Sequence, residues 1–262
     1  MPYQPVMIDR EDFLDEFHQM MQPHSDIHVM RLLGAGKMGK SHLLTEVLPK
    51  IIAEHYPAYH SIIVDMRRET QTVPDYLYLL KTLLEKEPGM TFAFFDSAYQ
   101  DWLNRPKINV SGLSALLARV NISARGEEDD ARRFIPKLTS AFATDMHRHV
   151  EKKVVFMFDT VEQVSEFTQD WLMDTLLVHL ARLEHVRVIV AGRSLPDANG
   201  SYAARCAHFE LRPVTEEQAY IDFCHVHAPS LEDSAIRALA RAFDYRPGAF
   251  AETLGKVARG KI

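Results

Sequence analysis

Short apolar runs alternate along the chain with longer stretches in which apolar residues recur every three or four positions. The runs have the length of buried β-strands, and the longer stretches have the spacing of amphipathic helices. This alternation is typical of α/β proteins, in which helices connect the strands of a sheet. Five strands are predicted, over residues 28–33, 61–66, 153–158, 186–191 and 207–211.

Helices are predicted between these strands. The first contains the apolar positions of residues 44–52, and Pro49 should kink or shorten it because proline lacks a backbone N–H. The charged residues 126–133 predict a solvated loop. Further apolar helix faces are predicted within residues 77–84, within residues 92–103 with Leu103 on the face, within residues 135–146 and within residues 171–183.

Only helical patterns follow residue 212. Thr215 and Gln218 have the spacing of a capping box, and Ser230 is placed to cap the next helix, which carries apolar residues from Ile236 to Phe243. A last short helix is predicted within residues 250–258. We therefore expect an α/β domain over residues 1–212 and a small helical domain over residues 213–262.

Composition and charge limit the partners and the cellular compartment expected for the protein. The chain has 262 residues with 30 Lys and Arg against 36 Asp and Glu, so its net charge of −6 disfavours a nucleic-acid partner. Its two cysteines, Cys206 and Cys224, are too few for a disulfide framework and fit a reducing cytoplasm. Its apolar runs are far shorter than the ~20 residues of a membrane span, so no membrane role is expected.

The strongest chemical signal is the stretch between the first strand and the following helix. It reads G-A-G-K-M-G-K-S and matches the phosphate-binding pattern G-x-x-x-x-G-K-[ST] at every position. Glycines let the backbone N–H groups wrap a phosphate, Lys40 reaches the β- and γ-phosphates, and the Ser41 hydroxyl binds Mg²⁺. The residues expected to contact the nucleotide here are Gly34, Gly36, Lys37, Met38, Gly39, Lys40, Ser41 and His42.

Acidic partners follow the third strand. Asp159 comes directly after five apolar residues, at the strand end where ligands of open α/β sheets bind, and is expected to hold Mg²⁺ with Ser41. Glu162 lies three residues further and is a candidate to orient or deprotonate the attacking water. Arg193 follows the fourth strand, which should lie near the third, and could sense the γ-phosphate. The catalytic candidates are therefore Lys40, Glu162 and Arg193.

A second, weaker pattern is Cys224-His225-Val226-His227, which has the look of a metal site. It lies near the end of a predicted helix and has no fourth ligand in range, so zinc is not favoured.

Several stretches, taken with the loop, resemble the STAND-type ATPases, a signal-transduction branch of the P-loop proteins close to the AAA+ ATPases. Residues 7–13 are similar to the family's hydrophobic-Gly-Arg-Glu motif, with Asp9 in place of the glycine. Residues 158–162 resemble its Asp-Thr-aromatic-Glu form of the magnesium-binding strand, and residues 190–193 resemble its sensor strand. Residues 211–217 and 246–250 resemble two motifs of its helical lid.

This resemblance implies further contacts and a fold. Arg10 would lie on the adenine side of the nucleotide, and Pro213 and Pro247 would belong to the binding site. The fold would be a three-layer P-loop NTPase whose parallel five-stranded sheet has the order 5-1-4-3-2, followed by a helical lid that closes over the nucleotide. The strand that ends in Asp159 would lie beside the strand that precedes the loop. Family members usually continue into further domains, so a chain that stops at Ile262 is either a minimal module or a truncation.

Three functions are compatible with these residues. The first is a cytoplasmic ATPase, binding ATP or ADP with Mg²⁺ and hydrolysing slowly, that acts as a switch in signalling or defence by controlling self-association or a partner protein. Slow turnover is expected because Thr160 follows Asp159 where most AAA+ hydrolases have Glu. The alternatives are a DNA-associated AAA+ ATPase, such as a loader or transposition helper, and a nucleotide-binding scaffold without hydrolysis. No Asn-Lys-x-Asp motif for guanine is present. An arginine from a neighbouring copy would be Arg125, Arg132 or Arg133.

Overall fold

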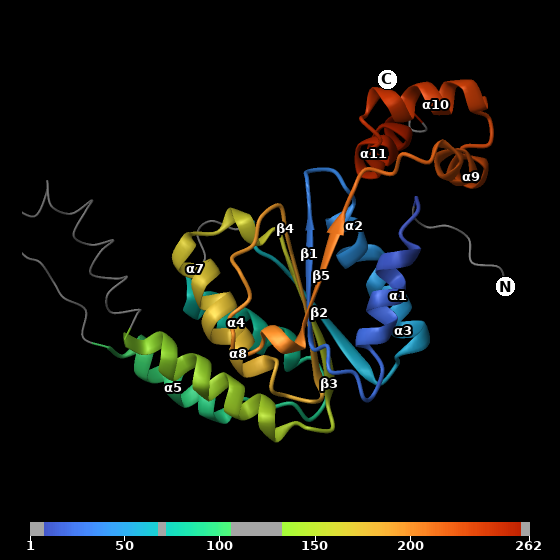
Figure 1. The fold of residues 1–262 in the computed structure, drawn as a ribbon. Coiled ribbons are helices and arrows are strands. Elements are labelled where there is room, and N and C mark those ends of the chain that lie inside the picture. Colours follow the sequence, from blue (N-terminus) through green and yellow to red (C-terminus); the bar gives the residue numbers. More distant parts are fainter. Residues whose placement is uncertain (1–7, 68–71, 106–132, 258–262) are drawn as a thin grey trace, which may run out of the picture.

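The computed structural model describes residues 8–67, 72–105 and 133–257 (Figure 1). Its centre is a sheet of five parallel strands: β1 (Val29–Gly34), β2 (Tyr59–Asp65), β3 (Lys153–Asp159), β4 (Val186–Gly192) and β5 (Cys206–Leu211). The order is β2-β3-β4-β1-β5, which is the predicted order read from the other edge. The three inner strands are almost completely buried, whereas β2 and β5 at the edges are partly exposed.

One predicted adjacency is wrong. The strand that ends in Asp159, β3, does not lie beside β1, because β4 pairs with both and separates them. In the register, Ile189 of β4 faces Met30 on one side and Met157 on the other. Every residue of β4 is buried, which suits a strand that has a neighbour on both edges and a helical layer on both faces.

Helices cover both faces of the sheet (Figure 1). On one face, α1 (Glu11–Met20) and the helix that follows β1 pack against a core that includes Val155 and Met157. On the other face, the remaining helices of the α/β part pack against Val154, Phe156 and Phe158. These helices are α4 (Val73–Leu84), α5 (Ala93–Leu103), a helix over residues 133–148, and the continuous run α7 (Glu166–Trp171), η3 (Leu172–Leu176) and α8 (Leu177–Leu180). The alternation of β3 side chains thus divides the apolar core between two layers.

The helix after β1 differs from the prediction at Pro49. It comprises α2 (Lys40–His42), a π-helical turn η1 (Leu43–Val47) and α3 (Leu48–His55), so the helix continues through the proline. A π-turn widens the backbone by one residue per turn and changes which carbonyl each N–H meets. The proline, which has no N–H, is therefore accommodated just after a local widening, without ending the helix.

Other differences concern single positions. Leu103 is 48% exposed and does not belong to the buried face of α5. The helix expected within residues 171–183 begins earlier, at Glu166, where the Ser165 hydroxyl accepts a hydrogen bond from Thr168 N. Of the predicted loop 126–133, residues 126–132 lie outside the described part, and Arg133 is helical.

The C-terminal helices form a separate layer with its own core (Figure 1). They are α9 (Glu217–His227), α10 (Asp233–Ala242) and α11 (Pro247–Val257). Ile8 is 3% exposed and packs in this core, although it precedes α1. Both predicted caps are wrong: the residues before α9 and α10 are Glu216 and Glu232, without side-chain capping bonds.

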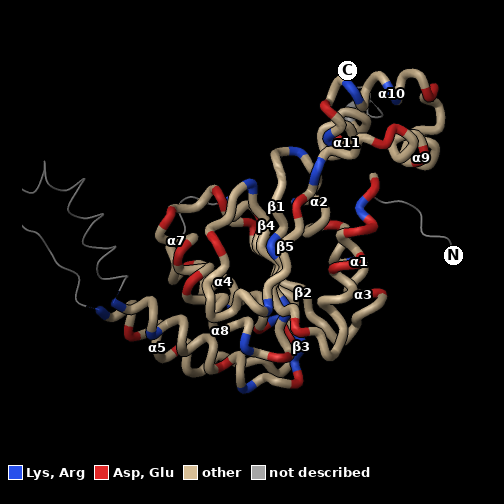
Figure 2. The backbone as a smooth tube through the Cα atoms, viewed as in Figure 1, with Lys and Arg blue, Asp and Glu red and all other residues tan. Residues whose placement is uncertain are grey.

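Charge is mixed over the described chain. Figure 2 shows basic and acidic residues interspersed along the helices that flank the sheet and along the C-terminal helices, without a continuous basic stripe. Within the described ranges, no helix combines the length and apolar character needed to cross a membrane.

Candidate functional site

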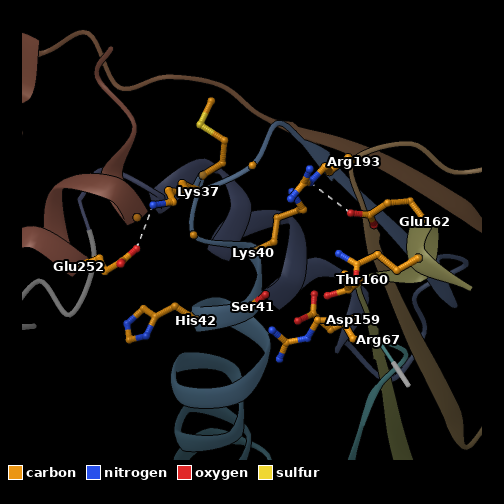
Figure 3. A pocket seen from close by; sticks show the side chains of 15 residues that line it. Lys37, Lys40, Ser41, His42, Arg67, Asp159, Thr160, Glu162, Arg193 and Glu252 are labelled. Atoms are coloured by element: carbon orange, nitrogen blue, oxygen red, sulfur yellow. Dashed lines mark ion pairs between the residues drawn. The ribbon is translucent and has the colours of Figure 1, made fainter. Parts of the chain in front are cut away.

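A cavity of about 400 Å³ opens at the carboxyl ends of β1, β3 and β4 (Figure 3). Its lining brings together the loop after β1, the acidic segment after β3 and the arginine after β4. The first turn of α11 contributes on the opposite side. Predicted site residues that line it are Gly36, Lys37, Met38, Gly39, Lys40, Ser41, His42, Asp159, Glu162 and Arg193.

The loop after β1 adopts a tight turn that depends on backbone conformation. Gly39 has φ +96°, a left-handed value that glycine adopts without cost, and it directly precedes α2. Lys37 also has a positive φ of 65°, which is unfavourable for a residue with a Cβ. Gly34 lies behind the cavity, where an added Cβ would stand 2.9 Å from the carbonyl oxygen of Leu211. The loop is thus packed tightly against β5.

Lys40 is the most buried cation of the cavity, with 9% of the residue exposed. Its Nζ donates hydrogen bonds to the carbonyl oxygens of Gly34 and, at 3.0 Å, Ala35. Burial lowers the pKa of Lys40, while the carboxylates of Glu162 and Asp159 oppose that shift. The ammonium is therefore held by the loop's own carbonyls, and a phosphate could replace them as its partner.

Asp159 is 2% exposed, and its Oδ1 has no hydrogen-bond partner among the described residues. A buried carboxylate oxygen without a donor is costly, and a cation bound there would remove that cost. Ser41 lines the same cavity and supplies the hydroxyl expected of a Mg²⁺ site. The donor set is oxygen only, which fits Mg²⁺. The next residue, Thr160, has φ 62°, an unusual value for a β-branched residue.

Glu162 and Arg193 face each other at the side of the cavity (Figure 3). Arg193 Nε lies 3.4 Å from Glu162 Oε1, and Glu162 Oε2 is buried without a partner among the described residues. The same guanidinium packs on the loop, 3.6 Å from where a Cβ on Gly36 would stand. Arg193 therefore bridges the phosphate-binding loop and the candidate catalytic carboxylate.

The residues expected near adenine lie apart from this group. Arg10 and Pro213 line a second cavity of about 250 Å³, beside α1 and the end of β5. Arg10 Nη2 donates to the carbonyl oxygens of Met38, at 3.2 Å, and Arg212, at 3.1 Å. Arg10 therefore joins the loop to the connection that leads into the C-terminal helices. Pro247 is buried at the start of α11 and lines neither cavity.

Five residues of the main cavity were not predicted as site residues: Arg67, Thr160, Gln163, Gly248 and Glu252. Arg67 follows β2 and is held by Asp65, with Nη2 to Oδ2 at 2.6 Å. The strand-end rule that indicated Asp159 and Arg193 would also have found Arg67. Gly248 and Glu252 come from α11, and no local spacing indicates which loop that helix approaches.

The remaining candidates do not join the site. Cys224 is buried, and His225 Nε2 lies 3.1 Å from Asp233 Oδ1. Within the described ranges, no three potential ligands of His, Cys, Asp or Glu gather to hold a metal. Arg125 and Arg132 fall outside the described residues, and Arg133 is exposed on the helix over residues 133–148.

Comparison with solved structures supports the fold. The chain is similar to the Walker-type ATPase Paby2304 of Pyrococcus abyssi, with a TM-score of 0.52 and 16% identity over 99% of this chain and 71% of that one. It is also similar to Cdc6p from Pyrobaculum aerophilum, with a TM-score of 0.58 and 11% identity over 98% of this chain and 62% of that one. No protein-family model and no curated protein sequence matches the chain. The five parallel strands in the order β2-β3-β4-β1-β5, with helices on both faces, match the P-loop NTPase fold.

Proposed function

We propose that this chain binds ATP and ADP with Mg²⁺, hydrolyses ATP slowly and acts as a nucleotide-controlled switch of the STAND type. The observation that carries the proposal is the meeting of loop residues 36–41 with Asp159, Glu162 and Arg193 at one cavity. The three side chains come from the ends of two neighbouring strands, β3 and β4. In this proposal Lys40 and the loop N–H groups bind the phosphates, and Arg10 and Pro213 lie on the adenine side.

Asp159 and Ser41 would hold Mg²⁺, which when bound would neutralise phosphate charge and orient the β- and γ-phosphates. Glu162 would accept a proton from the attacking water. Arg193 is 63% exposed whereas Glu162 is 14% exposed, so the arginine is the more mobile partner of the pair. A γ-phosphate would draw Arg193 away from Glu162 and leave that carboxylate as the base. Thr160, where most AAA+ hydrolases have Glu, supports slow turnover.

The C-terminal helices would serve as the lid that reports the nucleotide state. Gly248 and Glu252 line the phosphate-side cavity, so a lid movement would change that cavity directly. ATP and ADP would favour different lid positions, and the output would be self-association or release of a partner protein. The two described cysteines are unpaired, which agrees with a cytoplasmic setting. The net charge of −6 continues to disfavour the DNA-associated alternative.

The decisive experiment is titration of the purified chain with MgADP and MgATP by calorimetry, after removal of any co-purified nucleotide. Lys40→Ala should abolish binding, while Lys50→Ala, which changes an exposed lysine of α3, should bind like the wild type. Equal affinity in the two variants would contradict the phosphate site. Identical size distributions with ADP and a non-hydrolysable ATP analogue would contradict the switch but not the binding.

A further inference from the structure

The first turn of α11 contacts the backbone of the phosphate-binding loop directly. Gly248 N donates a hydrogen bond to the carbonyl oxygen of Lys37 at 2.9 Å. A Cβ on Gly248 would stand 2.6 Å from that oxygen and 3.2 Å from Gly39 N. Only glycine permits this approach, so any other residue at position 248 would push α11 away from the loop.

This hydrogen bond fixes the orientation of one loop peptide. The described chain has no cis peptide bonds, and in a trans peptide the C=O and the N–H point in opposite directions. Because the Lys37 carbonyl points at α11, the N–H of Met38 points away from α11. Lys37 has an unfavourable positive φ, so the bond from Gly248 helps to hold a loop conformation that the isolated loop would favour less.

The next peptide of the loop is held in the same way by a different group. The Met38 carbonyl accepts from Arg10 Nη2 at 3.2 Å, which orients the N–H of Gly39. Two successive loop peptides are thus held from outside the loop, one by the C-terminal helices and one by the N-terminal segment. Arg10 also binds the Arg212 carbonyl, at the connection into those helices.

We propose that Gly248 is a positioning residue, which holds the loop with its Met38 N–H directed at the phosphate and thereby couples lid docking to binding of a nucleoside diphosphate or triphosphate. The proposal rests on the proposed function and deepens it. Loop N–H groups of this kind bind the α- and β-phosphates. Loss of the Gly248 contact should therefore weaken the binding of ADP as much as that of ATP. Coupling is reciprocal, so a bound phosphate should also stabilise the docked lid.

The neighbouring ion pair is not the main link. Lys37 Nζ lies 3.2 Å from Glu252 Oε2, but the two side chains are 61% and 46% exposed. Exposed pairs contribute little and are screened by salt. Glu252→Gln removes this ion pair and one negative charge from the cavity lining, so its effect on the affinity for MgADP measures the charge contribution of α11 separately from the Gly248 contact.

The test is Gly248→Ala, compared with Gly200→Ala, whose added Cβ meets nothing within 4 Å. We expect Gly248→Ala to weaken binding of MgADP and MgATP alike by about tenfold, and Gly200→Ala to leave both unchanged. Alanine favours helix formation, so α11 itself should not be destabilised. Hydrogen exchange should accelerate in residues 34–41 and 246–252 of Gly248→Ala, with the exchange of β3 and β4 unchanged.

Unchanged affinity in Gly248→Ala would overturn the proposal, and tighter binding would show that the contact blocks the site. A second measurement needs no variant: MgADP added to the wild type should slow exchange in residues 246–252, and no change there would contradict the coupling. Failure of the proposed function is distinguishable, because it would appear as no binding by the wild type or as equal binding by Lys40→Ala.

Discussion

Arg193 Nε lies 3.4 Å from Oε1 of Glu162, and this contact joins the segments that follow two neighbouring strands, β3 and β4. Gly192 gives this contact room, because a Cβ there would stand 2.9 Å from Ser194 O and 3.1 Å from the other carboxylate oxygen of Glu162. The ion pair holds the candidate base close to the phosphate-binding loop.

Replacing Glu162 by Gln should therefore reduce turnover while sparing nucleotide binding. The amide keeps the shape of the side chain but cannot accept a proton, so kcat for ATP should fall by about a hundredfold or more. The Kd for MgATP should stay within about threefold of the wild type, because no phosphate contact is removed. Steady-state phosphate release and calorimetry measure the two quantities.

The matched control is Glu166→Gln, which changes an exposed glutamate in the first turn of α7, outside the cavity. Its turnover should equal that of the wild type. If Glu162→Gln also hydrolyses ATP at the wild-type rate, Glu162 is not the base. Absence of turnover in the wild type would favour the nucleotide-binding scaffold.

Thr160 stores backbone strain beside Asp159. Its φ of 62° is unfavourable for a β-branched residue, whereas asparagine tolerates that conformation. Thr160→Asn should raise the free energy of unfolding by about 1 kcal/mol. Thr160→Gly should raise the free energy of unfolding by less than Thr160→Asn does, because glycine also increases the entropy of the unfolded chain. Urea denaturation would measure the free energy of unfolding of the wild type and the two variants. A Thr160→Asn variant less stable than the wild type would contradict strain at this position.

Arg10 should contribute to both stability and binding. Burial lowers the pKa of its guanidinium, and its Nη2 binds two backbone carbonyls that methionine could not bind. Arg10→Met should reduce the free energy of unfolding by about 1–2 kcal/mol and weaken MgADP binding. The control is Arg182→Met at an exposed position, where a change within about 0.5 kcal/mol is expected. Equal stability of the two variants would exclude a bridging role.

His28 should make stability depend on pH. It is 1% exposed, and burial, followed by the charge of Arg187, lowers its pKa despite the opposing carboxylate of Glu184. Because the unfolded chain binds a proton more readily than the folded one, stability falls as the pH drops below the ordinary histidine value of about 6.5. The loss ends once the pH passes below the folded pKa.

The comparison of wild type with His28→Gln isolates this contribution, because burial also lowers the pKa of His185 and other histidines in both proteins. Between about pH 7 and 5 the free energy of unfolding should fall more steeply for the wild type. If the free energies of unfolding of the wild type and His28→Gln changed in parallel with pH, the pKa of His28 would not be lowered by folding.

Local spacing was enough to predict the loop and the strand ends. A strand, a glycine-rich turn and a helix in sequence place Gly39 just before α2, and an apolar run that closes on an acid places Asp159 at the end of β3. The wrong adjacency of β3 and β1 was taken from the family resemblance, and the apolar pattern could not correct it because β3 and β4 both carry runs of buried apolar residues. Periodicity does not determine which of two such strands is central.

Contacts between distant segments explain what was missed. Gly248 contacts Lys37 only because the C-terminal helices pack onto the loop, and no spacing within 246–250 contains that information. The predicted capping box of α9 failed for a local reason: Gln218 Nε2 donates to Asp222 Oδ1 at 2.8 Å instead of completing the box with Thr215. Arg67 could have been found, since it lies just beyond the end of β2.

The position of Ile8 offers a way to follow movement of the C-terminal helices. Because this residue is buried in the core of α9, α10 and α11, a fluorophore or spin label attached at the adjacent Asp9, which is exposed, would travel with those helices. Paired with a label on the sheet side, it would report each docking and release of the lid as a change in distance. A bulky fusion placed close to Ile8 would instead bias the very equilibrium under study.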